Sequence, residues 1–69
     1  DCSYNDLTSL TLSNQTFLQR LLCNNNQLTT LDVSFDSQLM YINCRYNQIF
    51  DLRTIGCNNL RMIACQWNY

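Results

Sequence analysis

The stretch that decides the fold runs from Leu18 to Leu28 and reads LQRLLCNNNQL. Apolar side chains at Leu18, Leu21, Cys23 and Leu28 precede and follow a polar bend that contains Asn26. The alternation around Leu21 and Cys23 has the two-residue period of a short strand with one buried face, and helical spacing fits it poorly. The stretch therefore predicts a short strand followed by an asparagine-rich bend.

The same pattern recurs at a constant interval of 21 residues along the whole chain, without insertion or deletion. Cysteine and, three residues later, asparagine form two columns: Cys2, Cys23, Cys44 and Cys65, and Asn5, Asn26, Asn47 and Asn68. Further apolar columns are Leu7, Leu28 and Ile49; Leu10, Leu31 and Leu52; Leu18, Leu39 and Leu60; and Leu21, Ile42 and Ile63. A fixed period of this length indicates a repeat architecture in which each unit packs on its neighbours.

Each unit also contains two similar halves. The series Leu18, Leu21, Cys23 and Asn26 is repeated ten residues later by the series Leu28, Leu31, Val33 and Asp36. We therefore predict an all-β-rich repeat solenoid of about three turns over residues 1–69, with two short parallel strands per turn and no regular α-helix. The first strands are expected near residues 21–24, 41–45 and 62–66. At residues 53–56 the pattern degenerates to RTIG, which weakens the prediction of a second strand in the last turn.

The composition favours a folded, non-catalytic chain. Hydrophobic residues make up 46% and charged residues 13%, and the net charge is −1, which excludes a disordered tail. The four arginines are scattered, so nothing points to nucleic acid, and no apolar run is long enough for insertion into a membrane. The chain has no His and no Glu, and Asp32 and Asp51 fall on different half-turns without a tuning partner. We therefore expect no enzyme activity, no catalytic residue, no metal and no cofactor.

The cysteine and asparagine columns are interpreted as structural. Four thiols in a line about 4.8 Å apart do not form the tetrahedral cage that zinc requires, and a disulfide needs β-carbons about 3.8 Å apart. We predict that the four cysteines are reduced, point inward and fill the core as small apolar groups. The asparagines are expected to satisfy backbone groups of their own and the next turn at each bend. Cys57 occupies the asparagine position of its half-turn and is expected to take over part of that role.

The segment Leu-x-x-Leu-x-Cys-x-x-Asn-x-Leu resembles the conserved segment of leucine-rich repeat proteins, with cysteine in a leucine position. The LTTLDVS sequence of residues 28–34 resembles the nested 21-residue class of bacterial leucine-rich repeats, and the cysteine column is similar to the cysteine ladder of internalin-like proteins. The resemblance covers the full chain. It implies a secreted or cell-surface bacterial protein that recognises a protein or a cell-surface glycan. A structural spacer and a cytoplasmic protein-interaction module remain alternatives, since the repeat is a scaffold with many ligands.

Candidate binding residues are those that the strand alternation turns outward. On the first strands these are Arg20, Leu22, Asn24, Tyr41, Asn43, Arg45, Met62, Ala64 and Gln66. Two residues after the cysteines, Tyr4, Tyr46 and Trp67 form a candidate aromatic ridge, broken by Asn25. Aromatic residues and arginine are enriched at interfaces. The alternatives are an ordinary solvated sheet face and bulky side chains that merely close the edge of the coil.

The two ends of the sequence lack the polar capping units that repeat arrays carry. Apolar core positions and strand edges are therefore expected to be open at both ends, which favours edge-to-edge association. We expect residues 1–69 to be an uncapped part of a longer array, with neighbouring repeats or end-to-end copies as partners.

Overall fold

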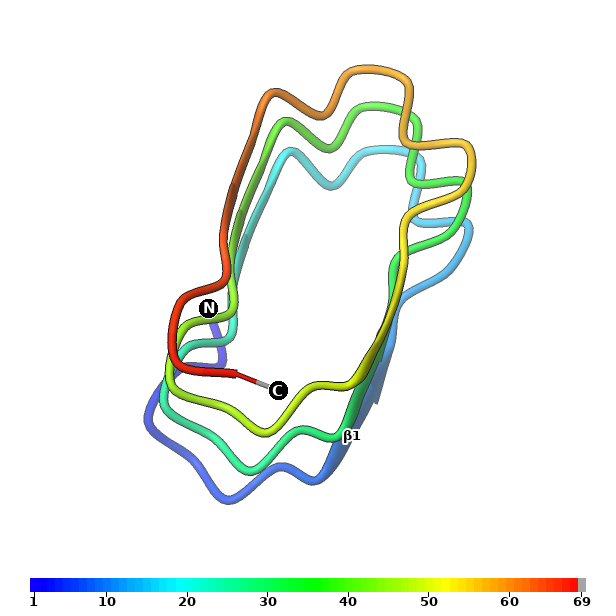
Figure 1. The fold of residues 1–69 in the computed structure, drawn as a ribbon. Coiled ribbons are helices and arrows are strands. Elements are labelled where there is room, and N and C mark those ends of the chain that lie inside the picture. The colour runs from blue at the N-terminus through cyan, green and yellow to red at the C-terminus, as the bar shows by residue number, and fades with distance from the viewer. Residues whose placement is uncertain (69) are drawn as a thin grey trace.

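The computed structural model describes residues 1–68 and contains strands but no helix in that range (Figure 1). Tyr69, which the expected array includes, lies outside the described residues. Each strand spans three residues: β1 (Ser9–Thr11), β2 (Arg20–Leu22), β3 (Thr30–Asp32), β4 (Tyr41–Asn43), β5 (Asp51–Arg53) and β6 (Met62–Ala64). The prediction of a β-rich chain with short strands and no α-helix is confirmed for residues 1–68.

The strands form two parallel three-stranded sheets, β1-β3-β5 and β2-β4-β6. Leu10 pairs with Leu31 and Leu31 with Leu52, so strand neighbours are 21 residues apart. Each return to one sheet passes through a strand of the other, and Figure 1 shows the two sheets on opposite sides of the molecule with successive windings of the chain lying over one another. The 21-residue period of the sequence is therefore the spacing between paired strands within each sheet.

The core lies between the two sheets and is best closed in the middle winding. Leu28, Leu31, Val33, Leu39 and Ile42 all have 0% of their surface exposed. Most of their counterparts one winding away, such as Leu10, Leu18, Leu52 and Leu60, are only partly buried, although Leu21 and Ile49 are 4% and 5% exposed. This follows from the strand order, because β3 and β4 have a neighbouring strand on both sides whereas the edge strands of each sheet have one on one side only.

The strands of the β2-β4-β6 sheet end earlier than the sequence predicted. The expected strands over residues 21–24, 41–45 and 62–66 stop at Leu22, Asn43 and Ala64. The backbone pairing continues beyond the strands, since the Cys23 N–H donates to the Asn43 carbonyl and the Asn25 N–H to the Arg45 carbonyl, both at 2.9 Å. The chain then turns at residues with positive φ, which include Asn25 at 60°. This left-handed bend, which strand periodicity does not reveal, sets the end of each strand.

The second strand of the last winding, which the sequence left in doubt, does form. β5 pairs with β3 at three successive positions, from Thr30 with Asp51 to Asp32 with Arg53. Its hydrogen bonds come from the backbone, so the polar substitutions at residues 53–54 do not prevent pairing. Leu52 keeps the inward apolar position on which the strand depends.

The asparagine column joins adjacent windings through its side chains. Asn26 Oδ1 accepts the N–H groups of Asn5 at 3.1 Å and Leu7 at 3.2 Å. Its Nδ2 donates to the carbonyls of Cys2 at 3.1 Å and Cys23 at 3.0 Å. The amides of Asn26, Asn47 and Asn68 thus each bond to their own winding and to the preceding one, whereas the sequence led us to expect the next one. A buried amide with both ends occupied satisfies backbone groups that the sharp bend removes from the strand ladder.

Cys57 supplies a donor at the asparagine position of the second half-turn. Its Sγ atom donates to the carbonyl of Val33, 24 residues earlier, at 3.0 Å. Asn47 Nδ2 makes the equivalent bond to the carbonyl of Cys23, also 24 residues earlier, at 3.0 Å. The thiol therefore reproduces one donor contact of the amide.

The loss of stability on replacing leucines of one column by alanine should follow how deeply each leucine is buried. Leu31→Ala leaves a cavity in the closed middle winding and is expected to lower the free energy of unfolding by about 2–5 kcal/mol. Leu10→Ala and Leu52→Ala, in the same column but partly exposed, should cost less. Phe17→Ala, at a side chain 85% exposed, should change the free energy of unfolding by no more than about 0.5 kcal/mol. Denaturant titrations that find equal losses for the three leucines would contradict the assignment of the core.

Candidate recognition surface

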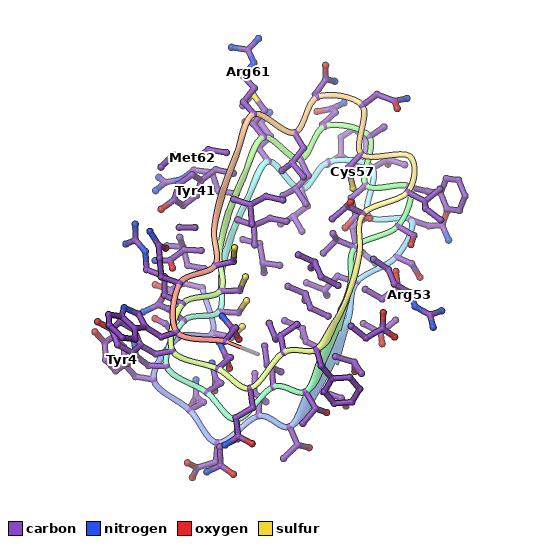
Figure 2. The ribbon with its side chains drawn as sticks, viewed as in Figure 1. Tyr4, Tyr41, Arg53, Cys57, Arg61 and Met62 are labelled. Carbon is purple, nitrogen blue, oxygen red and sulfur yellow. The ribbon has the colours of Figure 1, made fainter. Side chains whose placement is uncertain are left out.

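The outer surface of the β2-β4-β6 sheet carries the side chains that the sequence singled out for binding. The register places Arg20, Tyr41 and Met62 in one row across the three strands. The Arg20 guanidinium lies over the Tyr41 ring, 5.6 Å from its centroid, which is a cation–π contact. Figure 2 shows Tyr41 and Met62 projecting from the same outer side of the sheet. We call this surface, with Leu22, Asn24, Asn43, Arg45 and Gln66, the recognition face.

Polar contacts tie the far end of the recognition face together. The Arg45 Nε donates to Oε1 of Gln66 in the next winding at 3.1 Å. The backbone N–H of Arg45 donates to the Asn43 side-chain oxygen at 3.3 Å. Ala64 stands at a predicted outward position but is only 3% exposed. Ala64 shares the Asn43 stripe, but its methyl group is short compared with the side chains of Met62 and Gln66 in the flanking stripes.

The aromatic ridge of Tyr4, Tyr46 and Trp67 is exposed. These side chains have 77%, 52% and 68% of their surface exposed, so they do not close the core. The rings of Tyr46 and Trp67 stack with centroids 5.8 Å apart and planes 12° from parallel. Figure 2 shows Tyr4 pointing outward at the bend beyond the recognition face. Arg45 directly precedes Tyr46 in the chain, so the ridge begins where the recognition face ends.

All three ridge residues have a backbone conformation that large side chains rarely adopt. Their φ angles are 58°, 58° and 65°, in the left-handed region. That region costs an L-residue about 1–2 kcal/mol, least for glycine and asparagine. Asn25 occupies the same column with a φ of 60°. Stacking of the aromatic rings offsets part of this cost, since such pairs contribute about 0.5–1.5 kcal/mol.

A second column of left-handed bends, which we did not predict from the sequence, follows the strands of the β1-β3-β5 sheet. Asn14, Phe35 and Gly56 have φ angles of 63°, 63° and 79°. A methyl group added at Gly56 would lie 2.5 Å from Cδ1 of Phe35, so the ring covers the glycine. The recurrence of asparagine and glycine in a 21-residue column was the available signal, because these residues favour positive φ.

The outer surface of the β1-β3-β5 sheet differs in chemistry from the recognition face. It is an open polar depression bordered by Asp32, Asp51 and Arg53, and Figure 2 shows Arg53 on the side of the molecule opposite Tyr41. Arg53 pairs with Asp51 at 3.2 Å between exposed side chains. Hydrogen bonds from Ser34 lower the pKa of Asp32, and the Asp51 carboxylate raises the pKa of Arg53. The charges of this surface are therefore largely matched within it.

The cysteines are all free, and their burial is uneven. Cys23 and Cys44 are buried, whereas Cys2 is half-buried and Cys65 is exposed. The prediction of a buried column is therefore wrong for Cys65, which is covered by a winding on one side only. Burial, with the neighbouring Cys44 and Cys2 thiols, raises the pKa of Cys23 to about 12. Burial and the neighbouring Cys65 raise the pKa of Cys44 to about 11.

Residues 1–68 contain no group of three or more His, Cys, Asp or Glu side chains arranged to hold a metal ion. The same part of the chain contains no helix long and apolar enough to span a bilayer. Comparisons with protein families, with curated proteins and with solved structures find no match to this chain.

Thiol reactivity should follow burial. In the native protein at neutral pH, Cys65 should be alkylated first and Cys23 and Cys44 last, because burial blocks access and keeps these two thiols protonated. Mass spectrometry of timed samples measures the order, and unfolding before alkylation should expose five free thiols. A Cys23–Cys44 disulfide, or fast labelling of Cys23, would contradict this assignment.

The same thiols predict a loss of stability at alkaline pH. The unfolded chain releases their protons near the ordinary cysteine pKa of 9.0, while the folded chain holds them up to about 11 and about 12. Folding free energy contributed by the neutral thiols is therefore complete below pH 9 and decreases as the pH rises through this window. Cys23→Ala should flatten that decrease in denaturation curves recorded at several pH values.

Proposed function

We propose that this chain is part of a non-catalytic leucine-rich repeat solenoid that recognises another macromolecule through the recognition face and the aromatic ridge. The repeat assignment is supported by the 21-residue register, which is the same in all four strand pairings. It is also supported by the recurrence of the same amide contacts at Asn26, Asn47 and Asn68. In such arrays each winding contributes one row of outward side chains to an extended binding surface.

The observation that carries the binding function is the exposure of the aromatic ridge at strained bends. Asn25 shows that a small polar residue fits this column. Tyr4, Tyr46 and Trp67 nevertheless occupy it, at a cost in backbone energy and with more than half of each side chain in solvent. Strain retained at an exposed position is a feature of functional sites, and exposed tyrosine, tryptophan and arginine are the residue types that dominate binding energy.

Charge distribution favours the same side of the molecule. Arg20 and Arg45 lie on the recognition face, which has no acidic residue in its strands. The opposite sheet carries Asp32 and Asp51 together with Arg53. A partner protein or glycan with acidic groups would gain electrostatic complementarity on the first surface. By the resemblance of the sequence to bacterial surface repeats, we place the protein outside the cell or on its surface, with a cytoplasmic location as the alternative.

The alternative function is a structural spacer, in which the repeats set a distance and bind nothing. It is favoured by the regularity of the windings, since both sheets keep the same register and strand length. The aromatic ridge distinguishes the two proposals, because a spacer has no use for strained and exposed rings.

The test is to screen the protein against arrayed glycans and purified surface proteins and then to compare matched variants on any ligand found. Tyr41→Ala and Arg45→Ala should each weaken binding about tenfold or more, as expected for side chains at the centre of an interface. Arg53→Ala is the control, because it removes the same charge from the opposite sheet and should leave the Kd unchanged. All three should leave the melting temperature nearly unchanged, since surface substitutions rarely exceed about 0.5 kcal/mol. Equal Kd values for all variants would favour the spacer.

A further inference from the structure

Asp36 has a fully buried carboxyl group, and one of its two oxygens lacks a hydrogen-bond partner. It follows β3 in the bend and has 0% of its surface exposed. Oδ1 accepts the backbone N–H of Gln15 at 2.6 Å. Oδ2 is also buried and has no hydrogen-bond partner. An unpaired carboxylate oxygen in a closed core costs far more free energy than a neutral group that hydrogen-bonds.

The register shows what the second oxygen replaces. Asp36 occupies the position of Asn26 in the neighbouring half-turn, and in both the Oδ1 atom accepts an N–H from the residue 21 positions earlier. In Asn26 the other atom, Nδ2, donates to the carbonyls 24 and three residues earlier. For Asp36 the carbonyls at these offsets belong to Leu12 and Val33. The Oδ2 atom therefore stands where the asparagines place a hydrogen-bond donor.

The next member of the same column supports this equivalence. Cys57 also donates to the carbonyl 24 residues earlier, that of Val33, through its Sγ atom. The asparagine column and this column thus share one requirement, a donor directed at the carbonyl of the preceding winding. A carboxylate offers only acceptors, whereas a carboxylic acid has one O–H donor.

The charged and titratable groups around Asp36 do not stabilise a negative charge there. Burial raises its pKa, the N–H of Gln15 partly opposes this, and the Asp32 carboxylate adds to the rise. The Cys57 thiol faces it from the next winding. Among residues 1–68 the ion pair is that of Arg53 with Asp51 on the outer surface, so Asp36 has no cation of its own.

We infer that Asp36 carries a proton in the folded protein and donates it from Oδ2 to a carbonyl of the bend, so that a carboxylic acid replaces the asparagine amide. The hydrogen bond from Asp36 then makes the contact between the first two windings depend on pH. When the proton leaves, the bend loses a donor and gains a buried charge. Adjacent windings are therefore held together more strongly below the folded pKa of Asp36 than above it.

The sign of the effect follows from linkage. The folded state holds the Asp36 proton to a higher pH than the unfolded chain, whose carboxyl titrates near 3.8. Asp36 thus contributes its full stabilisation below the unfolded pKa, and that stabilisation is lost as the pH rises through the folded pKa. Each unit of pKa elevation corresponds to about a tenfold change in the folding equilibrium constant.

Asp36→Asn tests the inference, because an amide supplies the donor at every pH. The Tm of D36N minus that of the unmodified protein should be small below the unfolded pKa of 3.8, should increase as the pH rises above it, and should level off above the folded pKa. Asp32→Asn is the control, at the last residue of β3, four positions before Asp36. The Asp32 carboxylate accepts the N–H of Ser34 at 2.9 Å and its pKa is lowered, so D32N should lose stability at neutral pH, which is the opposite sign.

A carbon-13 NMR titration of the aspartate carboxyls in the unmodified protein gives a second readout that does not depend on variants. One carboxyl resonance, absent in D36N, should stay in its protonated position to a higher pH than the others. A resonance for Asp36 that titrates at or below the ordinary aspartate pKa would overturn the inference. So would a Tm difference between D36N and the unmodified protein that does not change with pH.

Discussion

The structure depends on a length constraint: each winding must place every residue beside its counterpart 21 positions away. The strands are only three residues long, but backbone hydrogen bonds between windings continue beyond them, as from the Asn25 N–H to the Arg45 carbonyl at 2.9 Å. The buried side chains of Asn26 and Asn47 extend this pairing through the bends, each bonding to carbonyls of two windings. A winding of another length would separate these partners and bury unpaired backbone groups, which a thin core cannot offset.

This constraint explains why the fold was largely readable from the sequence. The columns at Leu31 and Cys23 repeat because the structure repeats, and the alternation around them marks the inward face of a strand. The ends of the strands were not readable, because the left-handed φ at Asn25, Tyr46 and Trp67 ends each strand and two of these residues are types that rarely adopt it. Backbone conformation imposed by the neighbouring winding overrides local preference at these positions.

The candidate surface was only partly predictable for a similar reason. Alternation correctly separates inward Ile42 from outward Tyr41, yet it gives no information on how far each outward side chain is covered by its neighbours. Ala64 is buried for this reason, and Cys65 is exposed although its column is otherwise buried or half-buried. Contacts such as Arg20 over Tyr41 and Tyr46 on Trp67 join different windings and require the three-dimensional register.

The measurement that tests the length constraint most directly is the stability of two chains with extended middle windings. Duplication of residues 24–44 adds 21 residues and keeps every column aligned, while duplication of residues 25–44 adds one residue fewer. Under the proposed repeat architecture, stability grows with each well-matched interface, so the first chain should unfold at a higher denaturant concentration than the original. The second should unfold at a lower concentration. Equal midpoints for the two extended chains would contradict the central role of the 21-residue register.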